Sequence, residues 1–83
     1  MNVSRPVAST RYRESQRSAR ELKRLEREID QLEQREADLG VRMMKAASDH
    51  EQLIGLQREL EDARVQRESL EASWMEASEE PED

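Results

Sequence analysis

LKRLEREIDQLEQREADLGVRM, residues 22–43, repeats its apolar side chains at alternating steps of three and four residues. Six apolar residues and one charged residue, Glu36, make up this stripe: Leu22, Leu25, Ile29, Leu32, Glu36, Leu39 and Met43. The same steps recur in residues 53–77, at Leu53, Leu56, Leu60, Ala63, Arg67, Leu70, Trp74 and Ala77. Alternating steps of three and four place one side chain per half-heptad on a single seam of a helix. The two stretches therefore predict two coiled-coil helices.

The connection between the two stripes is short enough to make the helices antiparallel neighbours. Ser48 followed by Glu51 is a capping-box pattern, which predicts that the second helix begins near Ser48. In an antiparallel hairpin, the residue numbers of two facing seam positions have a constant sum. Here the sum is 95 or 96 for every pair, from Met43 with Leu53 to Leu22 with Trp74. We therefore predict an all-α fold, an antiparallel two-helix coiled-coil hairpin over residues 13–77, with helices at about 13–46 and 49–77 and a turn at 47–48.

The ends of the chain lack this pattern. Residues 1–12 have no apolar period and contain Pro6, so we expect a flexible lead-in. Residues 78–83 include four acidic residues and Pro81, so we expect a disordered acidic tail.

Some seam residues admit two interpretations. Glu36 and Arg67 lie on opposite helices about two layers apart, too far for an assured direct pair, and we interpret them as a device that sets the register. Gly40 and Gly55 flank the seam at one level near the turn and indicate either a close backbone approach or two tolerated helix glycines. Trp74 is interpreted as a core plug opposite Leu22, the alternative being an anchor for a partner.

The composition argues against catalysis. The chain has 83 residues, of which 41% are charged and 2% aromatic, which is too little apolar bulk for an enclosed pocket. It has no cysteine, no glycine-rich phosphate loop and a single histidine, His50, at an exposed helix start. No apolar run exceeds two residues. We expect no enzyme activity, cofactor, metal site, membrane span or small-molecule substrate.

Charge is distributed unevenly along the chain. Residues 1–27 carry eight basic and three acidic residues, whereas residues 28–83 carry six basic and seventeen acidic ones. Five arginines recur at steps of four, three, four and three, which places them on one outward helix face: Arg13, Arg17, Arg20, Arg24 and Arg27. Guanidinium groups so arranged can meet successive phosphates, so this face is a candidate site for DNA or structured RNA. The alternative is that Glu76, Glu79 and Glu80 return to its level and neutralise it.

The order of these features resembles a known family. An arginine-rich segment precedes the sequence Ala19-Arg20-Glu21-Leu22. Residues 32–39 have the pattern Leu-x-x-Arg-Glu-Ala-x-Leu. The turn Asp49-His50-Glu51 is followed by Leu53, and Leu70-Glu71 is followed by Trp74 before an acidic end. Over residues 13–80 the chain resembles the C-terminal coiled-coil domain of ABC-F ATP-binding cassette proteins of the Uup-like kind.

The resemblance implies a cytoplasmic parent protein that acts on translating ribosomes. ATP and Mg²⁺ would be bound by the parent's cassettes, and the hairpin would be a non-catalytic accessory domain that contacts DNA, ribosomal RNA or tRNA. The rival interpretation is a structural coiled coil that dimerises or docks on the parent's cassettes without binding nucleic acid. A concentration-dependent mass and a surface insensitive to salt would favour that rival.

Overall fold

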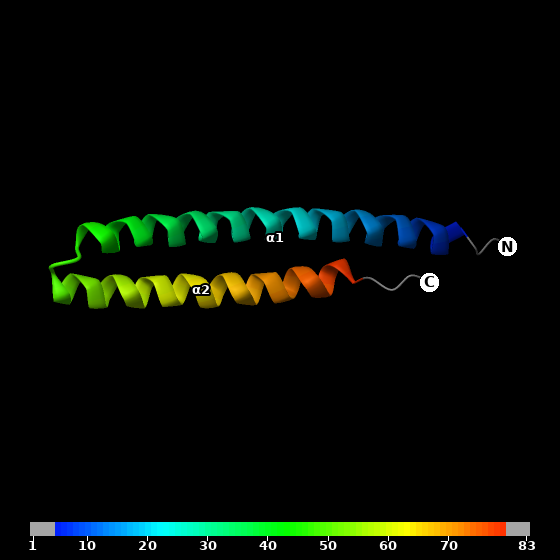
Figure 1. Ribbon diagram of the computed structural model, residues 1–83. Helices are drawn as coiled ribbons and strands as arrows, with labels where there is room; N and C mark the ends of the chain where they lie inside the picture. The colour runs from blue at the N-terminus through cyan, green and yellow to red at the C-terminus, as the bar shows by residue number, and fades with distance from the viewer. Residues whose placement is uncertain (1–4, 80–83) are drawn as a thin grey trace.

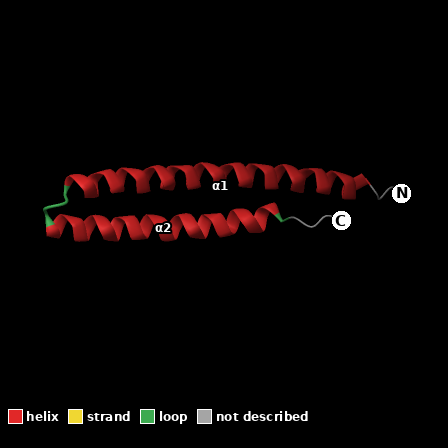
Figure 2. Ribbon diagram, in the orientation of Figure 1, coloured by secondary structure: helices red, strands yellow, loops and turns green. Residues whose placement is uncertain are grey.

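The computed structural model describes the backbone of residues 5–79 and the side chains of residues 16–79. Helix α1 spans Arg5–Lys45 and helix α2 spans His50–Ser78, and the two lie side by side in opposite directions (Figure 1). Apart from the turn between the helices and the residue after α2, the described chain is helical (Figure 2). The molecule is a rod of 75 × 14 × 14 Å. The all-α antiparallel hairpin is therefore confirmed.

Helix α1 is longer than the seam pattern indicates. It begins at Arg5, eight residues before the predicted start, and has 41 residues against 29 in α2. Pro6 lies in its first turn, where the missing N–H group has no intrahelical partner to lose. The first turns of α1 consequently extend past the end of α2 (Figure 1). Residues 1–4 of the predicted lead-in and 80–83 of the predicted tail lie outside the described residues.

The cap of α2 is Asp49, one residue after the position we predicted. Its side chain accepts a hydrogen bond from the backbone N–H of Gln52, with 3.1 Å between Oδ1 and N. The backbone N–H of Asp49 donates to the carbonyl of Ala46 at 2.9 Å and closes the turn. The prediction of Ser48 as the cap is wrong because residues 46–48 form the turn, and Asp49, whose dihedrals are extended, directly precedes α2.

The buried side chains confirm the predicted seam. Leu25 and Leu39 of α1 and Leu56 and Ala63 of α2 are each at most 6% exposed. Near the turn, Leu39 and Leu56 pack in one cluster that also includes Met43, Leu53 and Leu60. This cluster also contains Ala46, the first residue of the turn, which the predicted stripe did not include although it follows Met43 by three residues. The other seam positions are half-buried, since two helices alone cannot surround them.

The two charged seam residues are in direct contact. The Nε of Arg67 donates to the carboxylate of Glu36, and its Nη2 donates to the same carboxylate at 3.3 Å. Arg67 Nη1 also donates to Glu71 at 3.0 Å. These hydrogen bonds, first that to Glu36 and then that to Glu71, raise the pKa of Arg67 above its ordinary value.

Our expectation that Glu36 and Arg67 are too far apart is therefore wrong. Both side chains are long, and both run along the seam, where they are only 20% and 21% exposed. Two extended side chains on antiparallel helices can bridge a difference in level that their Cα positions suggest is too large.

The surroundings of Gly40, Gly55 and Trp74 distinguish between the two interpretations of each. A Cβ atom added at Gly40 or at Gly55 would meet no atom within 4 Å, so the glycines do not mark a close backbone approach. The indole of Trp74 is partly buried and donates from Nε1 to Glu26 of α1 at 3.1 Å. Trp74 thus joins the two helices near the open end of the hairpin, as expected of a seam residue.

Candidate functional site

The predicted arginine face lies on the outside of α1. Arg17, Arg20, Arg24 and Arg27 are all exposed and project away from the seam residues Leu22 and Leu25. Arg13 is on the same helix at the matching step, but its side chain lies outside the described residues. The structure therefore brings together four of the five predicted side chains on one helix face.

Arg24 differs from its neighbours because it is already bound to two carboxylates. Its Nη1 lies 2.9 Å from Glu28 and its Nη2 lies 3.2 Å from Glu21. The charge of Glu28, and after it that of Glu21, raises the pKa of Arg24. A phosphate that approaches Arg24 has to compete with both carboxylates, so this residue is the weakest candidate ligand of the face.

The other arginines are not paired in this way. Within residues 16–79, no ion pair joins Arg17, Arg20 or Arg27 to a carboxylate. Glu76 and Glu79, which the alternative interpretation assigned to neutralising the face, form no ion pair with these arginines in the described part of the chain. Glu80 lies outside the described residues.

Lys23 is a further cation of this face that the arginine pattern did not include. It lies three residues after Arg20 and four before Arg27, spacings that make side chains neighbours on a helix surface. Its side chain is exposed. A search for all basic residues at these spacings, rather than for arginine alone, identifies it.

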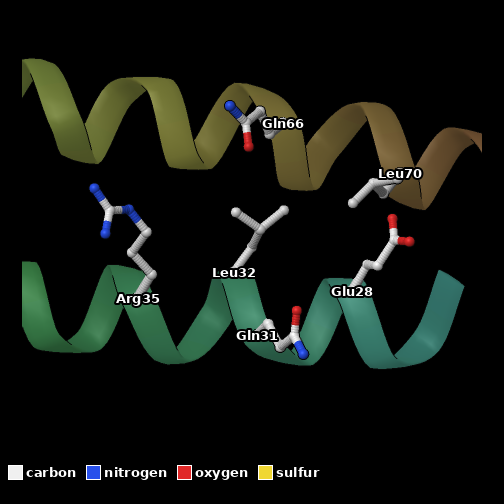
Figure 3. A pocket seen from close by; sticks show the side chains of 6 residues that line it. All are labelled: Glu28, Gln31, Leu32, Arg35, Gln66 and Leu70. Atoms are coloured by element: carbon white, nitrogen blue, oxygen red, sulfur yellow. The ribbon is translucent and has the colours of Figure 1, made fainter. Parts of the chain in front are cut away.

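A shallow groove runs between the helices further along the rod (Figure 3). Its lining includes Leu32, which points toward α2, and Gln66 and Leu70 of α2. Its charged groups are already paired, because Glu28 binds Arg24 and Arg35 binds Glu59 at 3.1 Å. The groove is open and offers no free charged group to a ligand.

The described residues contain no cluster of three or more histidine, cysteine, aspartate or glutamate side chains placed to hold a metal ion. His50 is exposed at the start of α2. No helix in the described part of the chain has the length and apolarity that a membrane crossing requires. The arginine face is thus the feature of the described surface with the clearest chemistry.

Comparison with known proteins identifies a family. A family model described as "ABC transporter C-terminal domain" matches residues 13–79. No curated protein and no solved structure matches the chain.

Proposed function

The chain belongs to the ABC transporter C-terminal domain family, and we propose that it is a non-catalytic accessory domain that binds nucleic acid through the outer face of α1. The proposed ligands are the phosphates, contacted by Arg13, Arg17, Arg20 and Arg27 with support from Lys23. The observation that carries the proposal is that Arg17, Arg20 and Arg27 are exposed and unpaired within residues 16–79. Unpaired arginines on one helix face repel one another, and an anion that binds between them relieves this repulsion.

Geometry supports contact with a phosphate backbone. From Arg13 to Arg27 the helix rises about 21 Å, which spans several successive phosphates. Arginine donates two parallel hydrogen bonds to a phosphate, and each contact releases condensed counterions. Bases are read by groove contacts or by stacking on aromatic rings, and this face carries neither a described aromatic ring nor an amide array. The proposed binding is therefore independent of base sequence.

The position of the face at the open end of the hairpin also supports the proposal. The first turns of α1 extend past α2, so the acidic second helix does not run beside them, whereas Arg20 and Arg27 lie level with the last turns of α2 on the outer side of α1 (Figure 1). Further along the rod, residues 28–83 are strongly acidic and repel phosphates. Nucleic acid would consequently contact the outer side of α1 near the open end of the rod and not its acidic remainder.

The parent protein is part of the same proposal. We place it among the cytoplasmic ABC-F proteins that act on the ribosome, with ATP and Mg²⁺ bound in its cassettes and not in this chain. The hairpin would then bring its basic end to DNA, ribosomal RNA or tRNA.

Fluorescence anisotropy with a short duplex DNA and a structured RNA tests the proposal. Four phosphate contacts predict a slope of about −3 to −4 in a plot of log affinity against log salt for duplex DNA. The triple variant Arg17→Glu, Arg20→Glu and Arg27→Glu is expected to abolish binding at low salt.

The matched control carries the same charge change far from the face. This control is the triple variant Arg42→Glu, Lys45→Glu and Arg58→Glu, at exposed residues near the turn. Its affinity for nucleic acid is expected to fall only modestly, through general repulsion. Equal losses in the two triple variants would show that net charge, not the face, drives binding. Absence of binding at low salt by the unmodified chain would refute the proposed function.

A further inference from the structure

The outer face of α1 changes character halfway along the helix. Toward the open end, its positions at steps of three and four are Arg20, Lys23, Arg27 and Asp30. The same series then continues as Gln34, Ala37, Val41 and Met44, all uncharged and all exposed. Gly40 lies beside them, one turn before Met44, with open space where a Cβ atom would stand. Thus α1 carries a second heptad stripe, on the side away from α2.

This stripe is unusual for the surface of a highly charged rod. Val41 is 51% exposed and Met44 is 78% exposed, so neither is covered by α2. The outward positions of α2 do not form such a stripe, because Arg58, Glu61 and Glu68 interrupt Ile54 and Val65. An uncharged stripe at coiled-coil spacing is the surface that a further helix covers.

We propose that the end of this stripe next to the turn, Val41 and Met44, docks against the same two residues of a second copy of the chain, in antiparallel orientation around a two-fold axis. Positions opposite each other would then have numbers that sum to about 85, which places Val41 against Met44 of the other copy. The long Met44 side chain would fall beside Gly40 of the other copy, where no Cβ occupies the surface.

Charge complementarity favours a second copy over an unrelated helix. On one edge of the stripe, the charged residues nearest its contact centre are Asp38, before Val41, and Lys45, after Met44, whereas Glu33 flanks the other edge further from that centre. Antiparallel pairing brings Asp38 near Lys45 of the other copy, and the two-fold axis repeats this contact, whereas a parallel pair would oppose like charges. Within residues 16–79, neither Asp38 nor Lys45 forms an ion pair in its own chain.

The contact is small, so the dimer is weak. Val41, Met44 and Gly40 of each copy cover far less than the roughly 800 Å² per partner of a stable interface, because Gln34 and Ala37 would face residues 51 and 48, beyond the end of the other copy's α1. If the proposed nucleic-acid face is also correct, the dimer places two basic faces about 65 Å apart at opposite ends, because Arg20 lies about 33 Å from the axis. The dimer itself does not depend on that function.

Sedimentation equilibrium of the 83-residue chain tests self-association. Between about 10 µM and about 1 mM, the weight-average mass is expected to rise from 9.8 kDa toward twice that value. Met44→Glu is expected to keep the mass at that of the monomer, without loss of helicity because Met44 is exposed. Met75→Glu, at an exposed apolar residue of α2, is the control and is expected to associate as the unmodified chain does. A monomer at every concentration, or association unaffected by Met44→Glu, overturns the proposal.

The absence of cysteine allows a direct test of orientation. Single variants Val41→Cys and Met44→Cys are mixed and oxidised at high protein concentration. Antiparallel pairing predicts that the mixed disulfide between the two variants exceeds either homodimer. Predominant homodimers overturn the antiparallel arrangement.

A charge exchange gives an independent readout. Asp38→Lys and Lys45→Asp are each expected to weaken the dimer, and the double variant is expected to restore it, since opposite charges again face each other. A double variant as weak as the singles overturns the proposed Asp38–Lys45 contact.

Discussion

At the scale of single residues, Asp49 determines where the second helix begins. Its carboxylate accepts the N–H of Gln52, whereas Ser48 belongs to the turn. Asp49→Ala is therefore expected to lower the free energy of unfolding by about 1 kcal/mol. Urea denaturation followed by far-ultraviolet circular dichroism measures the change. Ser48→Ala is the control and should have a smaller effect. Equal effects of the two substitutions would contradict the assignment of the cap.

Arg24 is the residue at which charge pairing limits the proposed nucleic-acid face. Glu28→Gln together with Glu21→Gln removes both carboxylates that hold its guanidinium. The double variant is expected to bind duplex DNA several-fold more tightly, with a salt dependence steeper by about one unit because one more phosphate contact forms. Anisotropy titrations at a series of salt concentrations give both quantities.

A control for this variant removes two negative charges elsewhere. Glu33→Gln with Glu51→Gln changes the net charge equally, at exposed residues that hold no arginine within residues 16–79. It should raise affinity slightly through weaker general repulsion and leave the slope unchanged. The same slope in both double variants would show that Arg24 gains no phosphate.

At the scale of the helices, Arg67 of α2 and Glu36 of α1 form an ion pair that joins the two helices in the middle of the rod. Both side chains are about one-fifth exposed, and Glu71 holds a second nitrogen of the same guanidinium. Arg67→Ala leaves Glu36 in the seam without its partner, so it is expected to destabilise the hairpin more than Arg64→Ala. Arg64 is half exposed, and its ion pair within residues 16–79 is with Glu61 of its own helix. Thermal denaturation of the two variants provides the comparison.

Replacing both members of the pair separates the role of charge from that of packing. Glu36→Leu with Arg67→Leu fills the seam with apolar side chains and is expected to raise the melting temperature above that of either single variant. A double variant less stable than Arg67→Ala would mean that the ion pair itself stabilises the fold. The same melting experiments distinguish the two outcomes.

At the scale of the whole molecule, the hairpin is a rod and not a compact domain. Its radius of gyration is 20.1 Å, whereas a compact domain of 83 residues would have about 12 Å. Small-angle X-ray scattering at low protein concentration, where the proposed dimer is dissociated, is expected to give a value near 20 Å. A value near that of a compact domain would show that α1 folds back instead of extending past α2.

Much of this architecture follows from the sequence. The steps of three and four predict both helices and most of the seam, and the short connection between them predicts their antiparallel order. The arginine face is equally predictable, since helix periodicity alone places Arg17, Arg20, Arg24 and Arg27 together on the outside. The start of α1 was not predictable from the seam, because residues 5–12 are helical without a partner stripe.

The periodicity of the sequence by itself determined the hairpin, its core and the position of the basic face. Only the tertiary structure decided which charges are paired: Glu36 with Arg67 across the seam, and Arg24 with two carboxylates of its own helix. It also decided that Asp49 caps α2 and that the acidic end of α2 leaves Arg17, Arg20 and Arg27 unpaired within residues 16–79. The physical reason is reach, because helical periodicity gives the direction of a side chain, whereas an ion pair depends on how far two flexible side chains extend between neighbouring turns or helices.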